Sequence, residues 1–349
     1  MTKDTIITGD ALEILKSLPD QCVHCVVTSP PYWGLRDYGL EGQMGSEKTP
    51  EEFIEKMVVL FREVRRVLLN DGTCWINIGD SYYGRKGMNG ASTSYANHER
   101  TLNKKALLGT KRGEYRPNDR PHPGLKPKDL VGIPWMLAFA LRADGWYLRQ
   151  DIVWNKPNPM PESVTDRCTR SHEFLFMLSK SKKYYYDAAA IRTPPAESSL
   201  QRWSQNIEAQ AGSDRVPGKT NGAMKAVGGY SRSERQRGHV LPHKGFNDKW
   251  DNMALAEQQA MGANKRSVWT AATASFKEAH FATFPEELIV DCIKAGCPAG
   301  GIVLDPFMGA GTTALVAKKQ GRHYLGIELN PTYVDIAEAR LKKELGLFA

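Results

Sequence analysis

A glycine-rich turn near the end of the sequence has the residue types that suit a bound nucleotide. The segment DPFMGAGTTA follows the apolar run GIVLD, so Gly309 and Gly311 stand where a predicted strand passes into a predicted helix. Glycine lets the backbone approach a ligand without interference from a Cβ atom, and the free amide groups at a helix N-terminus attract polar ligands. The turn therefore predicts a binding site for a nucleotide-like cofactor.

Two acidic residues end consecutive predicted strands beside this turn. Asp305 ends the strand before the turn, and Glu328 ends the next one, where a carboxylate can accept hydrogen bonds from both hydroxyls of a ribose. This placement indicates an adenosine-containing cofactor. An acid directly before the turn is unusual in a dinucleotide site and suits the cationic amino-acid tail of S-adenosylmethionine (SAM), while NAD and FAD stay open as alternatives.

A second candidate site lies near the N-terminus, in the segment VVTSPPYWG. The apolar run at 26–28 is typical of a buried strand, and it stops at Ser29, Pro30, Pro31 and Tyr32 because two successive prolines continue neither a helix nor a sheet. The prolines also stiffen the backbone, which fixes the directions of the Ser29 side chain and the Pro30 carbonyl group. Taken alone, the tetrapeptide is better explained as an ordinary proline-rich strand exit.

The elements that would position these two segments alternate between strands and helices. In the first half of the chain, the apolar spacing predicts a strand at 5–8, a helix at 11–18, a strand at 25–29, a helix at 50–69, a strand in 70–81 and a helix in 131–146. In the second half, it predicts a strand in 148–158, two strands about a basic turn in 171–186, a helix in 281–300, a strand at 301–305, a helix at 312–320, a strand at 323–329 and a helix from 330. This order predicts an α/β fold with a mostly parallel, mixed sheet and helices on both faces.

Two polar stretches rich in glycine and basic residues interrupt this order, at 84–128 and 196–265. The first holds eleven lysine and arginine residues against three acidic ones, and the whole chain has a formal net charge of +8. Their low hydrophobicity predicts loops or insertions outside the core. The positive charge favours a polyanionic partner, although solvated loops explain any single one of these residues equally well.

The composition excludes several other classes of protein. With 349 residues, of which 41% are hydrophobic and 25% charged, the chain can bury one substantial core. No apolar run approaches the roughly 20 residues that span a bilayer, and the N-terminus lacks the apolar core of a signal peptide, so we expect a cytoplasmic protein. Cys22 and Cys25 have metal-ligand spacing, but no second Cys or His pair follows at zinc-finger spacing. We therefore predict small core residues and no metal site.

Four motifs together resemble those of the amino-directed, SAM-dependent DNA methyltransferases. They are ITGDALEIL and TSPPY near the start and DPFMGAGTT and GIELN near the end, and the order of catalytic motif first and cofactor motif last resembles the beta class of that family. The resemblance covers residues 6–183 and 281–341. It implies a Rossmann-like methyltransferase fold with circularly permuted motifs. The implied parts are a catalytic part at 1–190 with a basic insertion at about 84–128, a variable target-recognition region at 191–266, and a SAM-binding part at 267–349.

The resemblance implies SAM as the cofactor and assigns residues to it. Asp10 matches the acid that contacts the adenine of the cofactor, and Glu328 matches the ribose ligand. The residues matched to the loop around the methionine part and the adenosine are Asp305, Phe307, Gly309, Gly311 and Thr312.

The same resemblance makes Ser29, Pro30, Pro31 and Tyr32 the catalytic turn. Oxygen atoms of Ser29 and Pro30 would accept the hydrogens of an exocyclic amino group and direct its lone pair at the methyl group, while the Tyr32 ring stacks on a base flipped out of the duplex. Trp33, Asn155 and Lys156 are further candidates for the base pocket. Packing explains Trp33 equally well, and a turn residue and a solvated lysine explain the other two.

The resemblance leaves the modified base and the partners open. Serine at position 29 favours cytosine N4, with adenine N6 as the alternative because family members with aspartate there mostly act on adenine. An RNA or protein methyltransferase, or a DNA-binding protein without catalysis, would fit less well. The expected partners are double-stranded DNA and a cognate restriction endonuclease, in the cytoplasm of a prokaryotic or phage-infected cell, with a dimer as one oligomeric state.

Overall fold

A computed structural model of the protein describes residues 2–35, 42–84, 117, 120–195, 197–198, 262–273 and 284–346. The chain divides into two compact units, which are residues 1–190 together with 266–349, and residues 191–265. Most of the two basic stretches predicted as insertions lies outside the described residues. In the second unit, the described residues Thr193 and Ala263 form an antiparallel bridge. The site belongs to the first unit.

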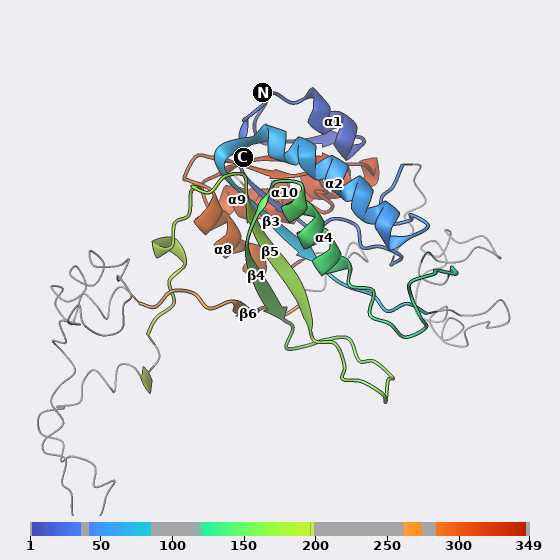
Figure 1. The fold of residues 1–349 in the computed structure, drawn as a ribbon. Coiled ribbons are helices and arrows are strands. Elements are labelled where there is room, and N and C mark those ends of the chain that lie inside the picture. Colours follow the sequence, from blue (N-terminus) through green and yellow to red (C-terminus); the bar gives the residue numbers. More distant parts are fainter. Residues whose placement is uncertain are drawn as a thin grey trace, which may run out of the picture. The chain divides into compact units, whose positions relative to one another are not determined.

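A sheet of eight described strands forms the centre of the first unit (Figure 1), in the order β1-β8-β7-β2-β3-β5-β4-β6. Neighbouring strands run parallel except at β5, which is antiparallel to both β3 and β4. The strands are β1 (Thr5–Thr8), β2 (Val23–Thr28), β3 (Leu68–Ile78), β4 (Tyr147–Asn155), β5 (His172–Ser179), β6 (Val268–Thr270), β7 (Ile302–Asp305) and β8 (His323–Glu328). The predicted mixed, mostly parallel sheet is confirmed.

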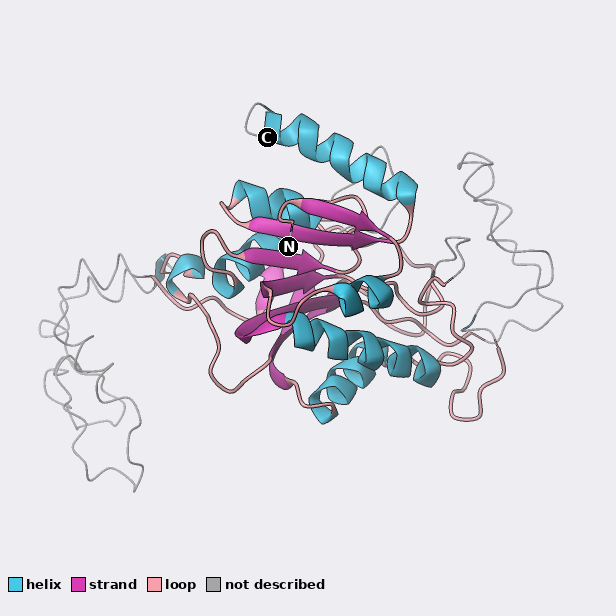
Figure 2. Cartoon of the chain, turned by 90° about the horizontal axis from the view of Figure 1, so that it is seen from above, coloured by secondary structure: helices cyan, strands magenta, loops and turns pink. Residues whose placement is uncertain are grey.

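Helices cover both faces of this sheet, as Figure 2 shows from above. One group of helices that pack on one another is α1 (Ala11–Ser17), α2 (Pro50–Val67) and α4 (Ile133–Ala143), and the other group is α8 (Glu286–Gly296), α9 (Thr312–Lys319) and α10 (Pro331–Leu345). A 3₁₀ turn, η2 (Ala189–Ile191), lies where the first unit gives way to the second. None of the helices within the described ranges is long and apolar enough to cross a membrane.

Local sequence fixes where the helices beside the site begin. The side chain of Asp10 accepts a hydrogen bond from the amide of Glu13 at the start of α1, and Asn330 caps α10 in the same way through the amide of Thr332. These side chains satisfy amide groups that the first turn of a helix leaves without partners. Both caps follow directly after strands β1 and β8, so the chain changes direction sharply at one edge of the sheet.

The core is built from the central strands and the helices that pack on them. Val26 of β2, Ile76 of β3 and Leu304 of β7 are buried, as is Phe61 on the inner face of α2. Cys25 is also buried within β2. Strands that are covered on both faces need a nearly continuous apolar sequence, which explains the uninterrupted runs seen around these residues.

Two predicted details of the sheet differ from the structure. Residues 180–186 do not form a second strand after β5, because β3 and β4 already pair with both edges of β5. The chain instead crosses the start of β3, where the Lys180 ammonium donates to the Leu68 carbonyl oxygen at 2.6 Å and the Tyr185 amide donates to the Asp71 carbonyl oxygen at 2.8 Å. Strand β6 was not predicted, since three residues are too few to show an alternating pattern.

The functional segments gather at one edge of the sheet because of strand direction. Strands β2, β7 and β8 are parallel and end at Thr28, Asp305 and Glu328. Strand β4 also ends at this edge, at Asn155, and the antiparallel strand β5 begins there at His172. Open α/β sheets place ligands beyond the carboxyl ends of their strands. This edge is therefore the expected location of the site.

Candidate active site

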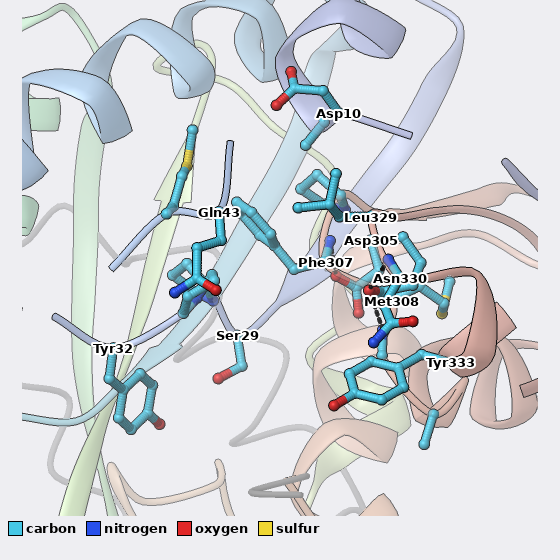
Figure 3. Close-up of a pocket in the computed structure, with 18 of the residues that line it drawn as sticks. Asp10, Ser29, Tyr32, Gln43, Asp305, Phe307, Met308, Leu329, Asn330 and Tyr333 are labelled. Atoms are coloured by element: carbon cyan, nitrogen blue, oxygen red, sulfur yellow. Dashed lines mark hydrogen bonds between the residues drawn. The ribbon is translucent and has the colours of Figure 1, made fainter. Parts of the chain in front are cut away.

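A cavity lies at this edge and brings together segments from both ends of the chain (Figure 3). Ser29 and Tyr32 lie on one side of it, and Met308 and Tyr333 lie on the other. The predicted site residues that line the cavity are Asp10, Ser29, Pro30, Pro31, Tyr32, Asp305, Phe307, Gly309, Thr312 and Glu328. The catalytic turn therefore shares one cavity with the glycine-rich turn that begins at Asp305, which we call the cofactor turn. More than 270 residues separate Ser29 from Asp305 in the sequence.

Glu328, at the end of β8, binds the backbone of the glycine-rich turn through its carboxylate group. Its Oε2 atom accepts a 2.8 Å hydrogen bond from the Gly309 amide, and its Oε1 atom accepts one of 2.9 Å from the Asn330 amide. Burial raises the pKa of the carboxyl group. Each carboxylate oxygen has two lone pairs, so both oxygens keep one acceptor position that the cavity can use. A pair of hydroxyl groups, as on a ribose, suits these positions.

The two glycines of the turn have different roles. Gly309 has φ +52° and lines the cavity, and Gly311 has φ +79° at the start of α9. Both values lie in the left-handed region that glycine adopts without steric cost. A Cβ atom on Gly311 would lie 2.9 Å from the Cβ atom of Ala337 in α10. This close packing of α9 against α10 explains a glycine at position 311, while its assignment as a cofactor contact stays a prediction.

Asp305 is buried and holds the cofactor turn to the strand of the catalytic turn. Its Oδ1 atom accepts hydrogen bonds from the Thr28 hydroxyl at 2.6 Å and the Phe307 amide at 3.0 Å, and its Oδ2 atom accepts one from the Thr313 hydroxyl at 2.7 Å. Burial raises the pKa of Asp305 to about 6. Because these donors occupy three of the four acceptor positions, one position on Oδ2 is left for a ligand.

Arg340 of α10 supports the same turn from behind and was not predicted from the sequence. Its Nη1 atom donates to the Thr312 hydroxyl at 2.9 Å and to the Ala310 carbonyl oxygen at 3.3 Å. Its Nη2 atom donates to Glu286 of α8 at 2.9 Å. A basic residue in an amphipathic helix gives no sequence signal for such a role, because most are solvated.

Aromatic and apolar side chains separate the two halves of the cavity. The Phe307 ring lies between the cofactor turn and Gln43 in Figure 3. Leu329, Met308 and Tyr333 also line the cavity and were not predicted. Met308 and Leu329 directly follow the predicted residues Phe307 and Glu328, and Tyr333 lies in the first turn of α10. Asp10 lines the cavity at its margin and also caps α1, so it is shared between folding and the site.

Behind the catalytic turn, a polar network crosses three strands. The Tyr32 hydroxyl donates to Glu173 Oε2 at 2.7 Å and lies 3.2 Å from Asn77 Oδ1, and the Ser29 hydroxyl lies 3.5 Å from the same Asn77 atom. The Asn77 amide donates to Glu173 Oε2 at 3.2 Å. Burial and the neighbouring carboxylate raise the pKa of Tyr32 well above its usual value, so its hydroxyl stays a neutral donor. Asn77 and Glu173 were not predicted.

The three further candidates for the base pocket, Trp33, Asn155 and Lys156, are not among the residues that line the cavity. Trp33 is 2% exposed and its indole donates to the Glu47 carbonyl oxygen at 3.0 Å, so it is a packing residue, which corrects the base-pocket assignment. The Asn155 amide donates to the Thr270 hydroxyl at 3.2 Å. The Lys156 ammonium pairs with Glu173, and therefore reaches Tyr32 through one carboxylate. A role of Asn155 and Lys156 in base binding stays a prediction.

The chemistry available to this cavity is that of hydrogen bonds and shape. Ser29 and Pro30 line it on one side, and the acidic residues Asp305 and Glu328 line it at the glycine-rich turn. Within the described ranges, no three His, Cys, Asp or Glu side chains are grouped as a metal site would require. An amino group placed near Ser29 would lie beside a ligand placed against the glycine-rich turn.

The sequence matches a family and its relatives over nearly its whole length. The family described as DNA methylase, N6_N4_Mtase, matches residues 23–339. The Type II methyltransferase M.Cfr9I of Citrobacter freundii is 45% identical, with coverage of 97% of this chain and 88% of that protein. The Type II methyltransferase M.SmaI of Serratia marcescens is 41% identical over 96% of this chain and 90% of that protein.

Solved structures share the fold. The Thermus thermophilus protein TTHA0409, a putative DNA modification methylase complexed with S-adenosyl-L-methionine, superimposes with a TM-score of 0.55 at 22% identity and covers 98% of this chain and 95% of its own. The PvuII DNA methyltransferase, described as cytosine-N4-specific, superimposes with a TM-score of 0.57 at 15% identity, covering 97% and 86%. Together with the sequence matches, these findings show that the chain belongs to the SAM-dependent N6/N4 DNA methylase family.

Proposed function

We propose that this DNA methyltransferase transfers the methyl group of SAM to N4 of a cytosine that is flipped out of duplex DNA. The observation that carries the proposal is the single cavity shared by the Ser29–Tyr32 turn and the turn between Asp305 and Gly309. An amino-group clamp and a cofactor site in one cavity provide the proximity that a direct transfer needs.

The residues around the glycine-rich turn fit SAM. The bound cofactor supplies an electrophilic methyl group on a sulfonium sulfur. Glu328 has two acceptor positions for the ribose hydroxyls, and Asp305 has one for the cationic amino group of the methionine tail. The acid Asp10 stands at the cavity margin for the adenine amino group, and Phe307 contributes an aromatic surface. This distribution of donors and acceptors supports the cofactor assignment residue by residue.

The catalytic turn addresses the low reactivity of an exocyclic amino group, whose lone pair is delocalised into the ring. The Ser29 hydroxyl and the Pro30 carbonyl oxygen would accept its two hydrogens, which favours a tetrahedral nitrogen and frees the lone pair for the methyl group. The amino hydrogens become stronger donors as positive charge develops on the nitrogen, so these acceptors would stabilise the transition state more than the ground state. As the nitrogen–methyl bond forms, the sulfur–methyl bond would break and leave a neutral thioether, and the nitrogen would lose one proton to water to regain a neutral amine.

Three features support cytosine over adenine. The acceptor at position 29 is a neutral hydroxyl, and its hydrogen-bond partner behind the turn is the neutral amide of Asn77, with the two oxygens 3.5 Å apart. Tyr32 is held by Glu173, so its ring is fixed behind the clamp. A fixed, bulky ring and a short serine side chain suit the smaller base, which must reach deeper toward the cofactor. Adenine N6 is the alternative, because its amino group has the same chemistry.

The basic stretches 84–128 and 196–265 are proposed to contact the duplex, with the second selecting the sequence. Their excess of lysine and arginine supports this role, since phosphate contacts supply much of DNA-binding affinity. The relatives named Type II methyltransferases also support a partner restriction endonuclease for this chain. Exchange of residues 196–265 for the matching segment of a relative with another target should move the methylated site.

Expression in a bacterial host without DNA amino-methylation tests the proposed activity. Genomic DNA digested to nucleosides and analysed by mass spectrometry should contain N4-methylcytosine only when the chain is expressed. An Asp305→Ala variant, which disrupts the cofactor turn, is the matched control and should leave the DNA unmodified. N6-methyladenine in place of N4-methylcytosine would reject the base while leaving the family assignment intact.

A further inference from the structure

The loop that joins β4 to β5 exposes an apolar side chain at the edge of the sheet that holds the site. Met160 in this loop is 80% exposed, and the next most exposed large apolar residue within the described ranges, Val268, is 59% exposed. Figure 1 shows this loop extending beyond the ends of β4 and β5. A single exposed apolar residue is common on protein surfaces. Met160 differs because it lies in a restrained loop at the edge of the sheet that holds the site.

The backbone around Met160 is held in place on both sides. Proline precedes it at position 159 and follows it at position 161, and each proline ring fixes the φ angle of its residue. On one side, the Asn158 amide group exchanges two hydrogen bonds with the backbone of Thr273, at 3.0 and 3.4 Å. The backbone of such a loop loses little conformational freedom when its side chain enters a partner.

On the other side of the loop, the acidic side chains are paired with basic ones. Glu162 accepts hydrogen bonds from the Arg167 guanidinium at 2.6 Å and from the Arg170 amide at 3.2 Å. Asp166, further along the loop, pairs with Lys128 at 2.5 Å. Both carboxylates are thus bound to cations, so the loop does not present an unpaired acid to the phosphates of a nucleic acid.

The loop is connected to the catalytic turn at its root. It leaves β4 at Asn155, and the next residue, Lys156, pairs with Glu173 at the start of β5. Glu173 in turn accepts the hydrogen bond from the Tyr32 hydroxyl. Met160 therefore stands on a braced loop whose base is fixed to the residue that is expected to stack on the flipped base.

We propose that Met160 is an apolar wedge that enters the base stack of duplex DNA when the target base is flipped. This inference rests on the proposed function, because it requires a base that leaves the duplex. Flipping leaves a gap in the stack, and apolar side chains such as methionine are used by DNA-binding proteins to occupy opened base steps. The unbranched thioether can adapt to such a gap. Met160 would thus stabilise the opened duplex without contacting the reacting atoms.

Methylation of two duplexes by Met160→Ala tests this role. One duplex carries the mapped target base in a normal pair, and the other carries it opposite a mismatch, where flipping needs less energy. We expect kcat/KM on the paired duplex to fall by about tenfold and kcat/KM on the mismatched duplex to change less than about twofold. Met160→Leu should retain activity on both, whereas Met160→Gln should behave like the alanine variant.

The control Val59→Ala removes an exposed apolar side chain from α2 and should leave both rates unchanged. SAM affinity should be the same in every variant. An unchanged rate of Met160→Ala on the paired duplex, or an equal loss on both duplexes, would overturn the wedge. Failure of the wild-type protein to methylate either duplex would instead reject the proposed function, so the two failures are distinguishable. If the modified base is adenine, the mismatch is placed opposite adenine and the test is unchanged.

Discussion

The Thr28 hydroxyl donates a 2.6 Å hydrogen bond to the Asp305 carboxylate and so joins the strand that carries the catalytic turn to the strand that carries the cofactor turn. Thr28 directly precedes Ser29, and both partners of the bond are buried. The distance between the amino-group acceptors and the cofactor turn is therefore fixed by a contact inside the sheet, independently of the loops around the cavity.

Replacement of Thr28 by valine should weaken both folding and cofactor binding. Valine keeps the shape but removes the donor, which leaves Asp305 with an unsatisfied acceptor, and the expected loss in the free energy of unfolding is about 1 to 3 kcal/mol. Thr28→Ser keeps the donor and is the matched control. Urea unfolding and calorimetric titration with SAM measure the two effects. Equal stability and SAM affinity in all three proteins would show that the contact does not position the turn.

The raised pKa of Asp305 makes stability and cofactor affinity depend on pH in opposite directions. Folded Asp305 has a pKa of about 6, above the usual 3.8, so the folded state binds the proton more tightly. Its contribution to the free energy of unfolding should therefore decline as the pH rises from 3.8 to about 6 and stay constant above. The ionised form is the one proposed to bind the cationic tail of SAM, so the affinity for SAM should rise over the same interval.

Comparison with Asp305→Asn isolates this contribution from those of other acids. The difference in unfolding free energy between the two proteins, measured by urea titration at several pH values, should vary below pH 6 and be flat above it. A difference that is independent of pH throughout this interval would contradict the assignment of the shifted pKa to Asp305.

Arg340 should affect cofactor affinity although it lies outside the cavity lining. Arg340→Met removes the bonds to Thr312 and Ala310, and the expected loss in SAM affinity is about tenfold, from one or two charged hydrogen bonds. Lys342→Met, on the exposed side of the same helix, is the control. Titration calorimetry gives both affinities. A normal affinity in folded Arg340→Met would mean that α10 does not hold the turn.

The Tyr32 hydroxyl and the Tyr32 ring should have separable effects. Tyr32→Phe removes the bond to Glu173 and keeps the stacking surface, whereas Tyr32→Ala removes both. Loss of a stacking side chain costs about 1 to 3 kcal/mol per base, so Tyr32→Ala should bind DNA with a mismatched target base roughly tenfold or more weakly than Tyr32→Phe. Fluorescence anisotropy of labelled duplexes measures the difference. Equal affinity of the two variants would remove Tyr32 from the base pocket.

The cofactor half of the site was predictable because its residues are local in sequence. Asp305 ends one strand, Phe307 and Gly309 follow it in the turn, and Glu328 ends the next strand, so a strand–turn–helix pattern sets their arrangement. Gly311 lies in the same pattern, but whether a glycine faces a ligand or a neighbouring helix depends on the packing of α10. The sequence pattern therefore predicts the turn, but tertiary packing decides which way each residue of the turn points.

The residues that support the site were not predictable because their partners are distant in sequence. Asn77 meets Ser29 and Tyr32 across neighbouring strands, and Glu173 meets Tyr32 only because β5 pairs with β3 in one register. Neither Asn77 nor Glu173 belongs to a motif. Trp33 illustrates the converse, since its position beside Tyr32 suggested the base pocket while the chain directs its side chain into the core.

Methyl transfer by the purified protein tests the central claim most directly. Wild-type protein and Ser29→Ala are incubated with SAM and unmethylated DNA, and nucleosides are quantified by mass spectrometry over time. N4-methylcytosine should accumulate with the wild-type protein and form about a hundredfold more slowly with Ser29→Ala, which should bind SAM normally. Accumulation of N6-methyladenine without N4-methylcytosine, or equal rates for the two proteins, would contradict a cytosine amino group held by Ser29.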